Sequence, residues 1–273
     1  MADLKRASLW AMGMVASARR WLRGLVALVL LPPALLAWSF AALIHALFGS
    51  TPRQAHRYYL GFARTCLIVG GTKLEVRGLE HLKPGQAYVV VSNHESNWDP
   101  PVVIAGLPTL VLRFVLKTQL LKVPIFGPAL RRTGNIAVDR SQSGADVKRL
   151  QSGMSDRDPD VSILFFAEGN RARDGSYRAF KMGAFATALD VKLPILPIAV
   201  AGTFPVWPAG TFWLNPAPVV LEVGAPIQVE SYAGSGDRAR LRDETHRVIA
   251  ELRNRARARL RARGVEPGGV DLT

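Results

Sequence analysis

The sequence contains a single cysteine, Cys66, among 273 residues. One thiol cannot form an intrachain disulfide, and without a second cysteine or a Cys/His cluster no ligand set exists for a structural zinc ion. These absences exclude a disulfide-stabilised extracellular scaffold and a zinc-ribbon type of domain. A chain with one thiol is suited to a reducing compartment.

The sequence also lacks any pattern of nucleic-acid recognition, although its net charge is +14. Strongly basic chains bind nucleic acid, anionic membranes or anionic substrates. Basic residues interleaved with aromatics, or a recognition-helix module, would indicate nucleic acid, and neither is present. The basic residues gather near the two ends, with ten arginines between Arg238 and Arg263. A surface of anionic lipid attracts such clusters by about 1 kcal/mol per residue, so we expect a membrane partner and no nucleic acid.

Residues 24–48 lack charged side chains and are mostly aliphatic. This length exceeds the roughly 20 apolar residues that span a bilayer. Pro32 and Pro33 divide it into segments 24–31 and 34–48, which favours two short helices folded back into one leaflet over one kinked spanning helix. Basic residues flank both sides, so charge gives no orientation. A cleaved signal peptide is a further alternative, but the run exceeds the usual 7–15 apolar residues of such peptides.

Short apolar and β-branched runs alternate with helical patterns from about Leu74 onward. We expect strands at residues 87–91, 111–115, 162–166, 195–200 and 219–223. This alternation predicts the α/β class, with a central, mostly parallel sheet flanked by helices. The expected organisation is an N-terminal membrane-anchoring helical segment (1–58), an α/β domain (59–235), and a basic C-terminal helix and tail (236–273).

The basic C-terminal segment has the pattern of an amphipathic helix over residues 237–264. It starts at an aspartate and stops at a glycine. An apolar stripe is formed by Leu241, Val248, Ile249, Leu252 and Leu260. Such a helix either packs one face on the domain or lies on an anionic membrane, and the pattern fits both uses.

A histidine and an aspartate lie five positions apart in the loop that follows the strand expected at residues 87–91. Ligands of α/β sheets bind beyond the carboxyl ends of strands, which is where His94 falls. A neutral imidazole can remove a proton from a hydroxyl group, while a carboxylate such as Asp99 fixes its tautomer. The alternative is structural, with Asp99 as the N-cap of a helix that starts at Pro100.

Two further loops carry arginines. Glu168, Gly169 and Arg171 follow the strand expected at residues 162–166, where glycine permits close backbone approach and arginine offers a fork to phosphate. A third loop, residues 134–140, ends with Arg140. Surface ion pairing is the structural alternative for each arginine. Together with the His94 loop, these segments indicate a site for an anionic substrate.

These motifs resemble those of the glycerophospholipid acyltransferase family, in particular the bacterial 1-acyl-sn-glycerol-3-phosphate (lysophosphatidic acid) acyltransferases. Asn93, His94 and Asp99 match the Asn-His-x4-Asp motif, and the Gly-x4-Asp-Arg motif is matched by residues 134–140. The Phe-Pro-Glu-Gly-Thr-Arg motif is matched over residues 166–171, with Ala167 and Asn170 replacing proline and threonine. Residues 180–183 and 193–198 fit the following motifs, so order and spacing agree from about residue 74 to residue 203.

The resemblance implies an acyltransferase of phospholipid biosynthesis at the cytoplasmic face of the cell inner membrane. Its donor would be acyl-CoA or acyl-carrier protein, its acceptor a lysophospholipid and its product phosphatidic acid, with no metal or other cofactor. It implies His94 as general base, oriented by Asp99. Arg171, Arg140 and Lys117 would hold the acceptor phosphate, next to Gly169, and Glu168 would orient Arg171 or the glycerol.

Three alternatives remain open on the sequence. The first is acylation of another acceptor, such as a lyso-aminolipid or lysophosphatidylethanolamine. The second is a lipid hydrolase, which the absence of a Gly-x-Ser-x-Gly nucleophile motif disfavours. The third is a non-catalytic membrane-binding protein, which the intact motif residues disfavour.

Overall fold

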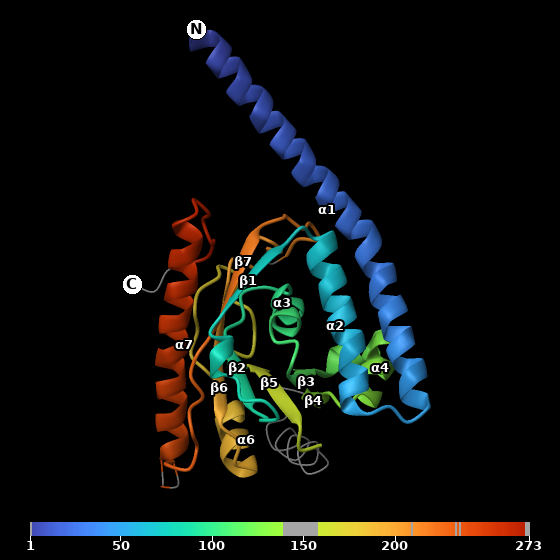
Figure 1. The fold of residues 1–273 in the computed structure, drawn as a ribbon, viewed down its shortest axis with the longest axis vertical. Coiled ribbons are helices and arrows are strands. Elements are labelled where there is room, and N and C mark those ends of the chain that lie inside the picture. The colour runs from blue at the N-terminus through green and yellow to red at the C-terminus, as the bar shows by residue number, and fades with distance from the viewer. Residues whose placement is uncertain (1, 139–157, 209, 233, 235, 271–273) are drawn as a thin grey trace.

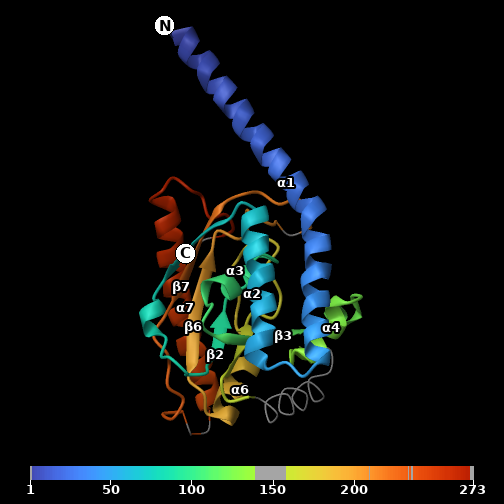
Figure 2. The same ribbon diagram turned by 45° about the vertical axis from the view of Figure 1, so that its right-hand side comes forward.

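The computed structural model describes residues 2–138, 158–208, 210–232, 234 and 236–270, and the side chains of the first helix from Ser17 onward except for residues 19 and 20. The chain folds into three layers, a central sheet with helices on both faces (Figure 1). This is the α/β architecture expected from the alternating pattern of the sequence. A long N-terminal helix projects beyond these layers (Figures 1 and 2).

Seven strands form the sheet in the order β1-β7-β6-β2-β5-β3-β4. Every neighbouring pair is parallel except β6 and β7. The expected mostly parallel sheet is therefore confirmed. The strands are β1 (Lys73–Arg77), β2 (Val89–Ser92), β3 (Val111–Lys117), β4 (Ile136–Val138), β5 (Val161–Phe166), β6 (Ile195–Ala201) and β7 (Pro218–Val223).

All five strands expected from the sequence are present, and β1 and β4 are additional. β1 alternates charged and apolar residues, and its outermost residues are exposed, because it is an edge strand. β4 has only three residues and pairs with β3 at the other edge. Edge strands need less apolar sequence than central strands, so they give a weaker signal.

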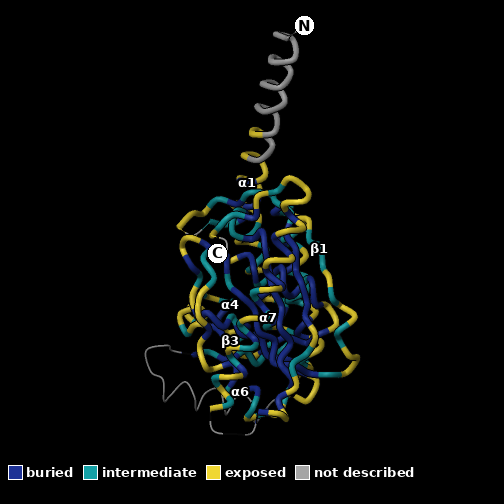
Figure 3. The backbone as a smooth tube through the Cα atoms, turned by 90° about the vertical axis from the view of Figure 1, so that its left-hand side faces the viewer, coloured by how far each residue is buried: buried dark blue, intermediate teal, exposed yellow. Residues whose placement is uncertain are grey.

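The two faces of the sheet bury different residues, because successive side chains of a strand point to opposite sides. Val90, Leu164 and Ile198 pack with Trp98 under α3 (Asp99–Gly106). On the opposite face, the neighbouring strand residues pack against α6 (Gly183–Val191) and α7 (Asp237–Arg261). Figure 3 shows the buried backbone concentrated in the centre of the domain, where the strands lie.

The first helix, α1, is continuous from Ala2 to Leu47 and contains both Pro32 and Pro33. The expected division into two helices at these prolines is therefore wrong. The helix changes direction where it reaches the domain (Figures 1 and 2), a response typical of prolines, which remove N–H donors. The hairpin forms one helix later, between α1 and α2 (Pro52–Val69), and Thr51 caps α2 through a capping box.

α1 and α2 run side by side in both views, and α1 also contacts α4 (Phe126–Arg132). The described residues also form two short 3-10 helices, η1 (Leu79–His81) and η2 (Thr118–Lys122). By length and composition, Trp21–Leu47 of α1 could cross a membrane. The boundary expected after residue 58 falls inside α2, so the structure shows no break there.

The C-terminal helix α7 packs one face on β6 and β7. Leu241, Ile249, Leu252 and Leu260 are buried in that contact. The packing use of this amphipathic helix is thus confirmed. α7 lies on the face of the sheet opposite α3, away from α1 and α2 (Figures 1 and 2).

Candidate active site

The site lies at the carboxyl ends of four parallel strands. The loops that follow β2, β5 and β6 begin at Asn93, Ala167 and Gly202, and β3 ends at Lys117. Parallel strands bring these ends to the same edge of the sheet, where α/β proteins bind ligands. The motif segments that the sequence keeps far apart are therefore neighbours.

His94 and Asp99 are in contact, as their five-residue spacing predicts. His94 Nδ1 lies 2.7 Å from Asp99 Oδ2. The same oxygen accepts hydrogen bonds from the backbone N–H groups of Glu95 (2.7 Å) and Ser96 (2.8 Å). Oδ1 accepts one from the hydroxyl of Thr203 at 2.5 Å. A carboxylate that accepts from all of these donors makes Nδ1 the protonated nitrogen of the imidazole and leaves Nε2 as a proton acceptor.

The capping alternative for Asp99 is wrong. Asp99 is the first residue of α3, and no side chain caps that helix. Both carboxylate oxygens point back to the loop and across to Thr203 instead. Sequence reasoning missed Thr203, although it stands just after a strand end, the position that indicated His94.

Two more residues fix the position of His94. The side-chain amide of Asn93 pairs with both the N–H and the C=O of Val200, each at 2.9 Å, and so joins the end of β2 to β6. The ring of Phe166 stacks on the imidazole with ring centroids 4.2 Å apart. Asn93 therefore has a structural role in its motif, and Phe166 restricts the orientation of the imidazole ring.

Glu168 contacts the histidine loop. Its Oε1 accepts a hydrogen bond of 3.0 Å from the backbone N–H of His94. The structure shows this partner, and no bond to Arg171, among the described residues. Gly169 has a φ of +81°, a conformation that disfavours other residues, and a Cβ there would meet the side chain of Lys181. The loop needs glycine for this turn.

The two glutamates next to the histidine are buried and have raised pKa values. Burial raises the pKa of Glu168 to about 8, with further increases from Glu95 and Asp99, against a decrease from the His94 N–H bond. Burial likewise raises the pKa of Glu95 to about 7, while Arg253 lowers it. Within the described residues, Glu168 Oε2 has no hydrogen-bond partner. Removal from water without full compensation favours the neutral carboxyl group.

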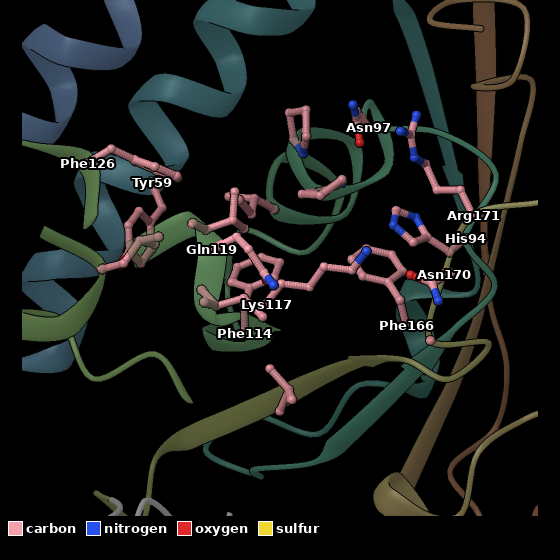
Figure 4. Close-up of a pocket in the computed structure, with 18 of the residues that line it drawn as sticks. Tyr59, His94, Asn97, Phe114, Lys117, Gln119, Phe126, Phe166, Asn170 and Arg171 are labelled. Carbon is pink, nitrogen blue, oxygen red and sulfur yellow. The ribbon is translucent and has the colours of Figure 1, made fainter. Parts of the chain in front are cut away.

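An apolar pocket of about 380 Å³ leads away from His94. In Figure 4, His94, Asn170 and Arg171 lie at one end and Tyr59 and Phe126 at the other. The wall between them is largely apolar and comes from α2, α3, β3, η2, α4 and the end of β5: Phe62, Pro100, Pro101, Ile104, Phe114, Leu116, Leu120, Phe126, Leu130 and Phe166. The site therefore has polar side chains at one end and an apolar cavity that extends from them.

Of the three cationic residues expected at the site, the structure describes the position of two. Arg171 and Lys117 both line the pocket. Arg171 lies beside His94, and Lys117 lies further along, between Gln119 and Phe166 (Figure 4). Arg140 lies outside the described residues. The structure thus brings His94, Asp99, Glu168, Gly169, Arg171 and Lys117 together.

A model of the family described as Acyltransferase matches residues 73–201 of the chain. The 1-acyl-sn-glycerol-3-phosphate acyltransferase of Pseudomonas aeruginosa is 36% identical over 193 residues, which are 70% of this chain and 68% of that protein. The protein of the same name from Limnanthes douglasii is 30% identical over 59% of this chain, which spans 57% of that relative. Human 1-acyl-sn-glycerol-3-phosphate acyltransferase alpha is 37% identical over 48% of this chain and 46% of its own length.

Among solved structures, the 1-acyl-sn-glycerophosphate (LPA) acyltransferase from Thermotoga maritima has a similar fold, with a TM-score of 0.71. The match covers 87% of this chain and 97% of that chain at 21% identity. At this identity the likeness concerns the fold. The match includes most of the chain outside the 73–201 segment.

We expect Glu168→Gln to raise the melting temperature, and the gain to grow with pH. The raised pKa means that, between about pH 4.5 and pH 8, the folded state binds a proton that the unfolded state has lost, so stability falls as pH rises. Glutamine keeps an oxygen for the His94 N–H but carries no charge. Each 1 kcal/mol corresponds to about 2–4 °C in a domain of this size.

Thermal melts of wild type and Glu168→Gln at about pH 5 and about pH 9 test this linkage. Glu251→Gln, an exposed glutamate of α7 paired with Arg247, is the control. Its effect should stay small at both pH values because solvent screens the pair. A Glu168→Gln gain that is equal at both pH values, or larger at low pH, contradicts the burial argument.

Proposed function

Since the chain belongs to the family of 1-acyl-sn-glycerol-3-phosphate acyltransferases, we propose that it transfers a fatty acyl group from a thioester to the free hydroxyl of 1-acyl-glycerol-3-phosphate. The observation that carries this proposal is the His94–Asp99 pair at the polar end of an apolar pocket. A base for a hydroxyl, a cation for a phosphate and a cavity for an acyl chain are adjacent. Acyl-CoA and acyl-carrier protein both supply the required thioester.

His94 acts as general base in this proposal. The acceptor hydroxyl transfers its proton to Nε2 while its oxygen attacks the thioester carbonyl carbon. A C–O bond forms, the C–S bond then breaks, and the departing thiolate takes the proton from the imidazolium. Asp99 stabilises the positive imidazolium and holds the ring in place. The products are an ester and a free thiol, and this balance requires no metal, no redox cofactor and no acyl-enzyme.

The apolar pocket binds the transferred acyl chain. Burial of each methylene group contributes about 0.8 kcal/mol, so a cavity lined by aromatic and aliphatic residues favours a long chain over water. The thioester carbonyl then lies near His94, and the thiol-bearing part extends out of the polar end. Tyr59 and Phe126 lie at the far end of the pocket (Figure 4).

Arg171 binds the acceptor phosphate, assisted by Lys117. Arg171 has no hydrogen-bond or ion-pair partner among the described residues, and it lines the pocket beside His94. A guanidinium grips a phosphate dianion through two parallel hydrogen bonds. The net charge of +14 favours both anionic substrates and an anionic membrane.

The exposed apolar stripe of α1 attaches the enzyme to the cytoplasmic face of the cell inner membrane. The stripe consists of Leu22, Leu25, Val29, Leu36, Phe40 and Leu47. α2 runs beside α1 and exposes Arg53, Arg57 and Arg64. A spanning α1 with α2 alongside would carry these arginines into hydrocarbon, at about 2.5–3.5 kcal/mol each. Attachment within one leaflet avoids this cost.

The general-base role predicts that His94→Ala loses at least about 100-fold in kcat, since general base catalysis contributes 10²–10⁴-fold. Turnover is measured with purified protein, acyl-CoA or acyl-carrier protein, and lysophosphatidic acid. His81→Ala, a histidine of η1 that does not line the pocket, is the control and should retain wild-type turnover. A His94→Ala variant that keeps a tenth of wild-type kcat would refute the mechanism.

The phosphate role of Arg171 predicts a loss that depends on the acceptor. Arg171→Ala should lower kcat/KM for lysophosphatidic acid at least about tenfold, because charge-assisted hydrogen bonds contribute about 1.5–3 kcal/mol each. Arg171→Lys keeps the charge without the fork and should raise KM for the acceptor several-fold. Lysophosphatidylethanolamine, a phosphodiester, should depend less on Arg171. Equal losses for both acceptors, or a rise mainly in donor KM, would exclude the phosphate role.

Membrane attachment through α1 predicts that Val29→Gln/Phe40→Gln releases the enzyme from vesicles. These side chains are 60% and 54% exposed, and burial of each in lipid contributes about 1.5–3 kcal/mol. Sedimentation with vesicles of mixed zwitterionic and anionic lipid should show at least a tenfold weaker partition, with unchanged melting temperature. Arg247→Gln on α7, across the sheet, is the control. Binding that follows Arg247 and not the α1 pair would place the membrane at α7 instead.

A further inference from the structure

Two arginines of α7 are buried, although most cations of this helix face solvent. Arg253 is 0% exposed and Arg257 is 2% exposed. Charged side chains are almost never fully buried unless they are paired, because removal from water is costly. Neither arginine belongs to the motifs of the sequence, so their burial calls for a separate explanation.

Arg253 connects four segments of the chain. Its Nε donates a 2.8 Å hydrogen bond to Glu95 Oε1 in the loop after β2. The same guanidinium donates to the carbonyl of Gly175 (3.1 Å), in the loop that carries Arg171, and to the carbonyl of Val270 (3.2 Å) in the C-terminal tail. It also lies 5.9 Å from the ring centroid of Tyr177. One side chain therefore holds both substrate-facing loops and the tail against α7.

Glu95 transmits this contact to the catalytic histidine. It follows His94 directly in the chain, and its backbone N–H donates to Asp99. Glu95, Asp99 and Glu168 are all buried, so three carboxyl groups surround the histidine loop in a region of low dielectric. Burial raises the pKa of both Glu95 and Glu168, the neighbouring carboxylates raise it further, and Arg253 lowers it. The arginine thus favours the charged form of the two glutamates against burial and against Asp99.

Resting on the proposed function, we propose that Arg253 is a positioning residue for acyl transfer: its guanidinium balances the carboxylates behind His94 and fixes the loop that carries Arg171. Arg257 supports the arrangement from the next turn of α7, since it donates to the carbonyl of Gly268 at 2.7 Å. The backbone carbonyl groups of the tail residues Gly268–Val270 accept hydrogen bonds from these two arginines. The helix most distant in sequence from the first motif therefore sets the geometry of that motif.

The guanidinium fork is needed for this role. The acceptors of Arg253 lie on three separate segments, and a planar group with five N–H donors serves them at once. A lysine keeps the charge but offers one compact ammonium group, which cannot reach all three acceptors together. A methionine of similar length removes the charge and leaves Glu95 buried without its cation.

Steady-state kinetics of Arg253→Lys and Arg253→Met with lysophosphatidic acid test this role, below the melting temperature of each variant. We expect Arg253→Met to lower kcat at least about fivefold and Arg253→Lys to lie between it and wild type. Donor KM should stay within about twofold of wild type, because the acyl pocket is built from other elements. Arg247→Met, an exposed arginine of the same helix, should match wild type.

The double variant Glu95→Gln/Arg253→Met separates positioning from packing. If Arg253 acts through the charge of Glu95, removal of both charges should restore kcat at least about threefold above Arg253→Met alone. Hydrogen–deuterium exchange gives a readout without activity, and Arg253→Met should accelerate exchange in residues 93–98 and 169–175 but not in β3. A structural role alone would lower the melting temperature without rescue by the double variant and without selective loop exchange.

The outcomes distinguish this inference from the function on which it rests. Wild-type protein inactive on every lysolipid would refute the proposed acyl transfer. Wild-type turnover, together with an Arg253→Met kcat within about twofold of it, would overturn the positioning role alone. Failure of the double variant to recover turnover, with exchange unchanged in both loops, would overturn it as well. Should Arg253→Met not fold, Arg253→Lys carries the same kinetic comparison.

Discussion

The site depends on one buried carboxylate. Asp99 is fully buried and accepts four hydrogen bonds, from the His94 ring, two backbone N–H groups and the hydroxyl of Thr203. Hydrogen bonds to a charged group contribute about 1.5–3 kcal/mol each, which offsets the cost of burying it. Because the donors come from the β2 loop and from the end of β6, the same interaction that orients the imidazole also joins two parts of the sheet edge.

The site has two environments around that carboxylate, one polar and one apolar. On one side lie polar and ionisable groups, including Glu168 and Arg171, and on the other an apolar pocket of about 380 Å³. The proposed acyl transfer between a thioester and a phosphate-bearing alcohol uses both environments, since the acyl chain and the phosphate have opposite solvation. The α/β fold supplies this arrangement because polar loops leave the sheet edge while α2, α3 and α4 cover it with apolar residues.

The sequence predicted the central strands and the motif residues because a short stretch of neighbouring residues is enough to recognise each of them. Apolar runs such as β5 are strands since they are buried on both faces, and His94 follows a strand end. Other features depend on tertiary packing and had no local signal. The partners of Asp99 and Glu95 stand 104 and 158 residues away, at Thr203 and Arg253. α1 stays continuous through its prolines because α2 and α4 support it, which overrides the local preference for a break.

The distance of 158 residues between Glu95 and Arg253 has a consequence for how the protein is made. The ribosome releases the N-terminal parts of a chain first, so every recognisable motif emerges before α7 does. Until α7 packs, Glu95 and its neighbouring carboxylates have no internal cation, and contacts of such long range form late and slowly. An interrupted chain that contains all the motifs lacks the Glu95–Arg253 ion pair, which the proposed positioning role requires. The proposed role of Arg253 therefore makes acyl transfer by newly made protein depend on the packing of its last helix.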